Sequence, residues 1–139
     1  MTRVEELLSI SSEGLAARPR NLANIHEPFP LGLELFRMLE CKNGFYAFES
    51  ALHVFPMTST AGMSLEEWNA ETLWRNGYHD LAKGLLFFAE DVFQNQFCLA
   101  AEGVLRFDAE TGATSLMADS IENWAKKILG DHRREVAGR

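Results

Sequence analysis

Cysteine is scarce in this chain of 139 residues, and its two copies, Cys41 and Cys98, lie far apart and form no C-x-x-C pair. The opening residues, MTRVEELLSISSEG, alternate charged and apolar side chains and lack the uninterrupted apolar centre of a signal peptide. Two cysteines without an export signal are typical of reduced thiols. We therefore expect a cytoplasmic protein without a disulfide bond.

Long apolar runs and an excess of basic residues are also absent. No apolar stretch approaches the roughly 20 residues that cross a bilayer, so no membrane partner is predicted. Lys and Arg number 13 against 20 Asp and Glu, for a formal net charge of -7. Nucleic acids and anionic membranes bind clustered basic residues, so we expect neither as the main partner. An acidic surface favours association with a basic partner instead.

Motifs for metal binding, nucleophilic catalysis and phosphate binding are missing too. The four histidines, at positions 26, 53, 79 and 132, do not pair with one another or with cysteine at metal-ligand spacing. There is no G-x-S-x-G turn and no glycine-rich phosphate loop. A triad assembled from distant residues stays open, but no motif points to one. We expect no enzymatic activity, no cofactor and no metal.

The residues that are present predict a single α+β domain. A hydrophobic fraction of 47% in 139 residues fits one core of ordinary size. Thr2 with Glu5 forms a capping box that opens a first helix, with an irregular arm completing residues 1–29. A second helix is expected from Pro30 to Asn43-Gly44, and strand periodicity appears within residues 44–56. Ser64 with Glu67 predicts a central helix.

Strands dominate the second half. Short apolar runs at 85–90, 96–100, 103–107 and 114–119 alternate with turn-forming residues, which predicts an antiparallel meander. A closing helix is expected from Asp119 or Ser120 to a stop at Gly130, followed by a charged tail at 131–139. The N-terminal, central and C-terminal helices should pack on one face of this sheet.

Acidic residues form one candidate site. Glu90-Asp91 and the D-A-E-T-G turn (Asp108, Glu110) could supply carboxylates for acid–base catalysis or for a cation. However, neighbouring residues on a strand face opposite sides of a sheet, and Asp108 is better explained as a turn-former. For all four residues we therefore favour a structural role over acid–base catalysis or cation binding.

Aromatic residues form a second candidate set. Trp68 lies on an ordinary core stripe, whereas Trp74 lies about 120° away around an unbroken helix. Either the helix breaks near Asn69, or Trp74 packs on a second surface with Tyr78. An exposed tryptophan there could anchor a protein partner, although burial is the commoner fate of a Trp in a small domain.

The order of motifs in the second half resembles the SUKH superfamily, which takes in yeast cell-wall assembly regulators and many bacterial immunity proteins. The motifs are A-E-D-x-F-x-N-Q-F-C-L and then G-V-x-x-F-D-x-E-T-G, with a strand and a helix after them. The similarity covers about residues 30–129. The matching positions are Ala89, Asp91, Asn95, Gln96, Phe97, Gly103, Val104, Asp108, Glu110 and Gly112, with Pro30, Phe36 and Asn43-Gly44 upstream.

Two departures from the family pattern stand out. Gln94 occupies a position where the family usually has glycine, which suggests that position 94 needs no positive φ or that Asn95 adopts it. The family also has a shorter helix before the Asn-Gly pair.

The resemblance implies a non-catalytic domain that binds another protein, and many members neutralise a toxin such as a nuclease. A bacterial immunity protein is therefore the leading hypothesis, and a regulatory or scaffold protein of the same fold is the alternative. A small hydrolase or ligand-binding protein using Glu90 and Asp91 is a third, and it predicts a pocket in which both carboxylates converge. The residues expected to contact a partner are Glu90, Asp91, Phe93, Gln94, Trp74 and Tyr78.

Overall fold

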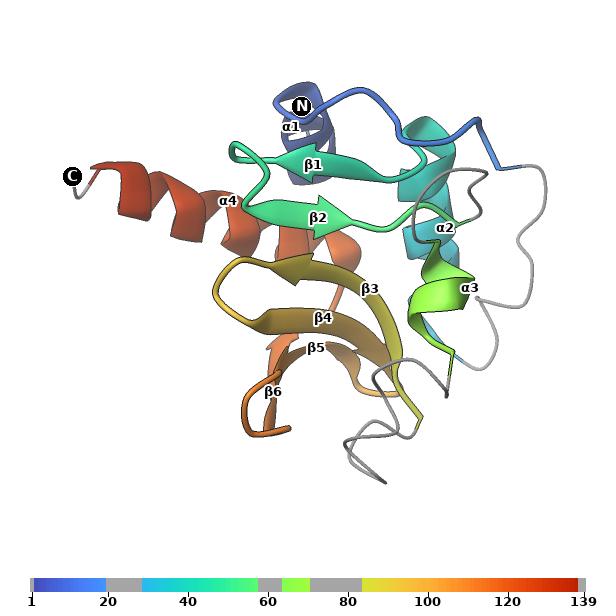
Figure 1. Ribbon diagram of the computed structural model, residues 1–139, viewed down its shortest axis with the longest axis vertical. Helices are drawn as coiled ribbons and strands as arrows, with labels where there is room; N and C mark the ends of the chain where they lie inside the picture. Colours follow the sequence, from blue (N-terminus) through green and yellow to red (C-terminus); the bar gives the residue numbers. More distant parts are fainter. Residues whose placement is uncertain (1, 20–28, 58–63, 71–83, 138–139) are drawn as a thin grey trace.

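The computed structural model describes residues 2–19, 29–57, 64–70 and 84–137, without the side chains of 133–137. Six strands form one antiparallel sheet in sequence order, as Figure 1 shows. The strands are β1 (Phe45–Ala47), β2 (Leu52–Val54), β3 (Leu86–Asp91), β4 (Asn95–Ala100), β5 (Gly103–Asp108) and β6 (Thr114–Ala118). The helices in the described ranges are α1 (Arg3–Ser9), α2 (Gly32–Cys41), α3 (Leu65–Trp68) and α4 (Ile121–Ala137).

The predicted α+β class and the second-half meander are confirmed, and the sheet is larger than expected. Residues 44–56, which were expected to contribute strand structure, form a hairpin of β1 and β2. This hairpin extends the sheet because Val54 pairs with Ala89 of β3. The sheet therefore includes part of the first half of the chain.

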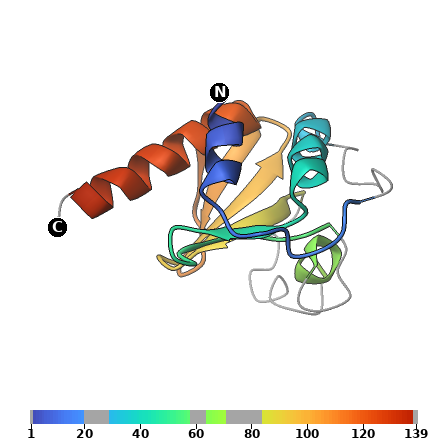
Figure 2. The same cartoon turned by 90° about the horizontal axis from the view of Figure 1, so that it is seen from above.

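Helices lie on both faces of the sheet, which corrects the expectation of one covered face. Helices α1, α2 and α4 cover one face, and α3 lies on the other (Figure 2). Phe88 points into the large core under the three helices, where its ring meets Trp124 of α4 edge-on at 5.1 Å. Phe87 points to the opposite face and meets Phe107 in a smaller cluster. The two adjacent phenylalanines therefore lie on opposite faces of the sheet.

Side chains at the helix starts satisfy free backbone N–H groups. Both predicted capping boxes are present, one at Thr2 and one at Ser64. Glu122 of α4 also accepts from the backbone of α1, at Arg3 N (2.6 Å) and Val4 N (3.1 Å). This contact joins α1 to the start of α4, and the helix dipole favours a carboxylate at the N-terminus of α1.

Helix α4 is longer than the sequence indicated. It passes through Gly130 and ends at Ala137, so the predicted stop and free tail are wrong for residues 131–137. Glycine costs about 1 kcal/mol in a helix interior. Here burial of Ile128, Leu129 and His132 on either side of Gly130 outweighs that cost. None of the helices in the described ranges combines the length and hydrophobicity that crossing a bilayer requires.

Candidate functional site

Three turns adjoin one another at one end of the sheet. They join β1 to β2 (48–51), β3 to β4 (92–94) and β5 to β6 (109–113), and we call them together the turn rim (Figure 1). Backbone hydrogen bonds connect neighbouring turns: Val92 N donates to Ala51 O at 3.0 Å, and Ala109 N donates to Gln94 O at 2.9 Å. The rim is therefore one continuous surface.

Backbone strain concentrates in this rim. In the described residues, positive φ angles outside glycine occur at Phe48 (56°), Glu49 (56°), Ser50 (71°) and Gln94 (68°), all within two adjacent turns. An L-residue in this region costs roughly 1–2 kcal/mol. The expectation that position 94 avoids a positive φ is wrong, because Gln94 itself adopts it. Strain of this kind is most common at functional sites, which makes the rim the leading candidate.

Asp91 holds the β3–β4 turn in shape. Its Oδ1 accepts from Phe93 N at 2.9 Å and from Asn95 N at 3.0 Å, and its Oδ2 accepts from Asn95 Nδ2 at 3.0 Å. A carboxylate that accepts local backbone N–H groups fixes a turn without help from distant residues. Asp91 thus positions the tip of the turn.

Two large apolar side chains project from that tip. Val92 is 63% exposed and Phe93 is 52% exposed. Exposed apolar side chains held on a rigid turn are well placed to contact a protein partner. Sequence reasoning included Phe93 and missed Val92, whose exposure depends on how the turn is folded.

The charge of the rim is acidic. Glu49 and Glu110 are exposed, and no Lys or Arg occurs in the three turns. Asp108 accepts from Glu110 N at 2.8 Å, which confirms its predicted role as a turn-former. The rim therefore combines exposed apolar groups with carboxylates, a combination that complements a basic surface.

Helix α4 supports the rim from beneath. His132 is 93% buried (7% exposed) and its ring stacks on Phe48 at 4.2 Å with an interplanar angle of 3°. Both His132 and Phe93 line a small cavity of about 220 Å³, together with Asp91 and Arg106. Sequence reasoning missed Phe48 and His132, since the supposed helix stop at Gly130 placed His132 in a free tail.

Glu90 belongs to the opposite face of the sheet. Its carboxylate lies 3.5 Å from His53 Nδ1 and 3.5 Å from Gln96 Nε2, and Gln96 Oε1 accepts from Trp68 Nε1 at 3.1 Å. Asp91 faces the α4 side, where it builds the turn. The hydrolase hypothesis requires Glu90 and Asp91 to converge in one pocket, and the structure places their carboxylates on opposite faces of the sheet.

The other predicted groups are placed as follows. Trp74 and Tyr78 lie outside the described residues. Cys41 is exposed and Cys98 is buried, and the two are not bonded to each other. The described part of the chain contains no cluster of three or more His, Cys, Asp or Glu side chains that could hold a metal ion.

Comparison with protein-family models, with curated proteins and with solved structures gave no match to this chain.

Proposed function

We propose that this chain is a non-catalytic protein-binding domain whose turn rim contacts a basic protein partner. The observation that carries the proposal is that the strained backbone positions of the described residues lie in one acidic rim, which also exposes Val92 and Phe93. Adjacent exposed apolar side chains bordered by carboxylates are typical of a surface that contacts another protein.

The rim is built to bind without rearrangement. Asp91 and the two backbone bonds between the turns fix the tip before any partner arrives. A preorganised surface loses little conformational freedom on binding, so more of its contact energy appears as affinity. Carboxylates around the tip accelerate encounter with a basic surface and disfavour acidic competitors.

The most concrete form of the proposal is an immunity protein that neutralises a bacterial toxin by direct binding. The ordered resemblance to the SUKH superfamily supports this form. The positive φ of Gln94 adds to it, because that position is where the family usually has glycine. A nuclease is a suitable toxin class, since its nucleic-acid site is basic and a carboxylate-rich rim could cover it.

Co-expression with a toxin encoded by the adjacent gene tests the proposal. We expect protection of the host cell and purification of a stable complex that weakens as ionic strength rises. Absence of both complex and protection would refute the immunity role.

A matched pair of charge reversals then tests the binding face. Glu110→Lys lies in the rim, whereas Glu102→Lys lies in the exposed β4–β5 turn at the other end of the sheet. Both substitutions change the net charge equally. We expect Glu110→Lys to slow association and Glu102→Lys to leave it nearly unchanged. Equal effects would place the contact elsewhere.

A further inference from the structure

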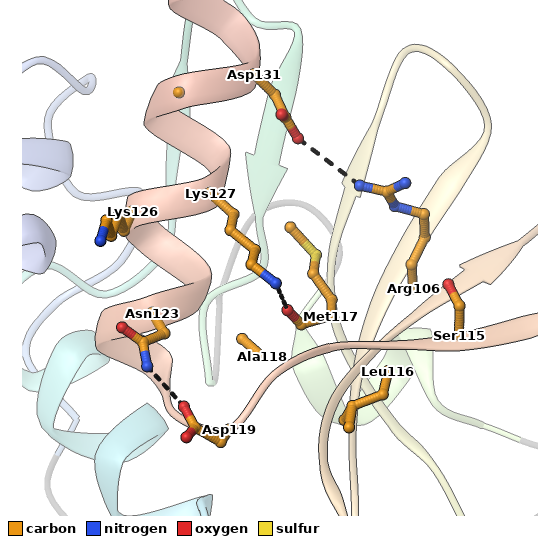
Figure 3. A pocket seen from close by; sticks show the side chains of 11 residues that line it. Arg106, Ser115, Leu116, Met117, Ala118, Asp119, Asn123, Lys126, Lys127 and Asp131 are labelled. Atoms are coloured by element: carbon orange, nitrogen blue, oxygen red, sulfur yellow. Dashed lines mark hydrogen bonds and ion pairs between the residues drawn. The ribbon is translucent and has the colours of Figure 1, made fainter.

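A groove separates the last strand from the last helix. Its volume is about 870 Å³, and its walls include Arg106, Ser115, Met117, Lys127 and Asp131 (Figure 3). Strand β6 runs directly into α4 through Asp119, so the two elements meet at one end and enclose the groove between them. The groove lies outside the three turns of the rim, and it shares Arg106 and Asp131 with the small cavity beneath the rim.

One side of this groove is an open sheet edge. Strand β6 is the last in the strand order, so its outer side has no partner strand among the described residues. Ala113 O accepts from Asp108 N, so the backbone groups of Ala113 point inward, toward β5. Ser115, two residues further along and paired with Arg106, points its backbone groups the same way. Antiparallel strands alternate inward and outward backbone groups, so Thr114 and Leu116 direct theirs outward. An extended peptide could form backbone hydrogen bonds there.

The edge lacks most of the usual protection against pairing. The strand, TSLMA, contains no charged residue and no proline, and Leu116 is 62% exposed. A bulge at Met117 limits regular pairing to residues 114–116. Lys127 Nζ donates to the Met117 carbonyl oxygen, so a side chain occupies an acceptor that an added strand could use.

The groove has basic groups available for an acidic ligand. Arg106 Nε is buried and has no hydrogen-bond acceptor in the described structure. Arg106 Nη2 lies 3.7 Å from Asp131 Oδ2, a long distance for an ion pair. Lys127 would become available for a carboxylate once a peptide N–H replaced it at Met117. The groove walls carry three cations (Arg106, Lys126 and Lys127) and two carboxylates (Asp119 and Asp131), so the groove is net positive in a chain whose net charge is -7.

We propose that this groove binds an extended, carboxylate-bearing segment of a partner protein by strand addition to β6. Side chains of an added strand alternate between the faces of the sheet. Carboxylates on one face would meet Arg106 and Lys127, and apolar side chains on the other would cover Leu116. The ligand pattern is therefore alternating acidic and aliphatic residues.

A labelled peptide that alternates valine with glutamate is a direct probe, with fluorescence anisotropy as the measurement on the full chain. We expect it to bind, and a peptide that alternates valine with lysine not to bind. A third peptide, methylated on the backbone nitrogens that would face β6, should also fail, because it cannot donate to the edge.

Three variants locate the site. Leu116→Pro removes an outward N–H, whereas Leu116→Ala keeps it and only shortens the side chain. Lys127→Glu reverses a groove charge, and Arg37→Glu, on the exposed side of α2, makes the same charge change elsewhere. We expect Leu116→Pro and Lys127→Glu each to weaken binding about tenfold or more. Leu116→Ala should weaken it less, and Arg37→Glu should have no effect.

Several results would overturn the proposal. One is absence of binding by the valine–glutamate peptide, and another is equal binding by the lysine peptide or by the methylated peptide. Full affinity in Leu116→Pro, with its fold verified by circular dichroism, would also refute strand addition. If that variant does not fold, the methylated peptide decides the same point. A chain dimer that Leu116→Pro dissociates, without peptide binding, would assign the edge to a second copy instead.

Discussion

Replacing Gln94 by glycine should stabilise this protein. Gln94 has a φ of 68° in the β3–β4 turn, a conformation in which its Cβ crowds the backbone. Its side chain is exposed, and the turn uses only its carbonyl oxygen, which accepts from Ala109 N. Glycine keeps that carbonyl and removes the crowding.

Two opposing terms set the expected size of the effect. Relief of the left-handed conformation is worth roughly 1–2 kcal/mol. Glycine also gives the unfolded chain more freedom, which costs roughly 0.5–1 kcal/mol. The midpoints of these two ranges predict that Gln94→Gly raises the free energy of unfolding by about 0.75 kcal/mol.

Urea unfolding followed by circular dichroism measures this change, with Gln94→Ala as the control. Alanine keeps the strained backbone and removes only an exposed side chain, so its stability should stay within about 0.5 kcal/mol of the parent protein. Equal stability of the glycine and alanine variants, at unchanged urea slope, would show that position 94 is not strained.

Further substitutions test other parts of the structure by the same unfolding assay. Asp91→Ala removes the acceptor of three hydrogen bonds and should cost about 2 kcal/mol; a loss below that of Glu90→Ala would contradict its role in the turn. Gly130→Ala should add about 0.5–1 kcal/mol, because the position is inside α4 with no atom within 4 Å of a new Cβ. Gly44→Ala should cost about 2–4 kcal/mol, since φ is +79° and its Cβ would lie 2.6 Å from Pro56 N. Similar stabilities of Gly130→Ala and Gly44→Ala would refute both the helical environment of Gly130 and the close contact of Gly44 with Pro56.

Local signals were sufficient for most of the secondary structure. Ser64 with Glu67 predicted the start of α3, and short apolar runs separated by turn-forming residues located β3 to β6. These features depend on neighbouring residues, which a sequence displays directly. The β1–β2 turn was missed because Phe48, Glu49 and Ser50 adopt left-handed conformations without the glycine or asparagine that normally indicates one.

Tertiary packing determined what the sequence did not reveal. Gly130 has the local character of a helix stop, yet burial of the residues around it continues α4 and places His132 beneath Phe48. The candidate site was therefore predicted in part. Asp91, Phe93 and Gln94 were identified from the β3–β4 turn, whereas the contributions of the hairpin and of α4 come from contacts between distant segments.

The central claim is that the exposed tip of the turn rim binds a protein partner. Titration calorimetry with the partner identified in the proposed co-expression experiment tests it, by comparing Phe93→Ser with Leu33→Ser, a change at an equally apolar, 44% exposed position on α2. We predict that Phe93→Ser weakens the complex by about 2 kcal/mol, or roughly 30-fold, and that Leu33→Ser leaves its affinity unchanged. Unchanged affinity in a folded Phe93→Ser variant would contradict the claim.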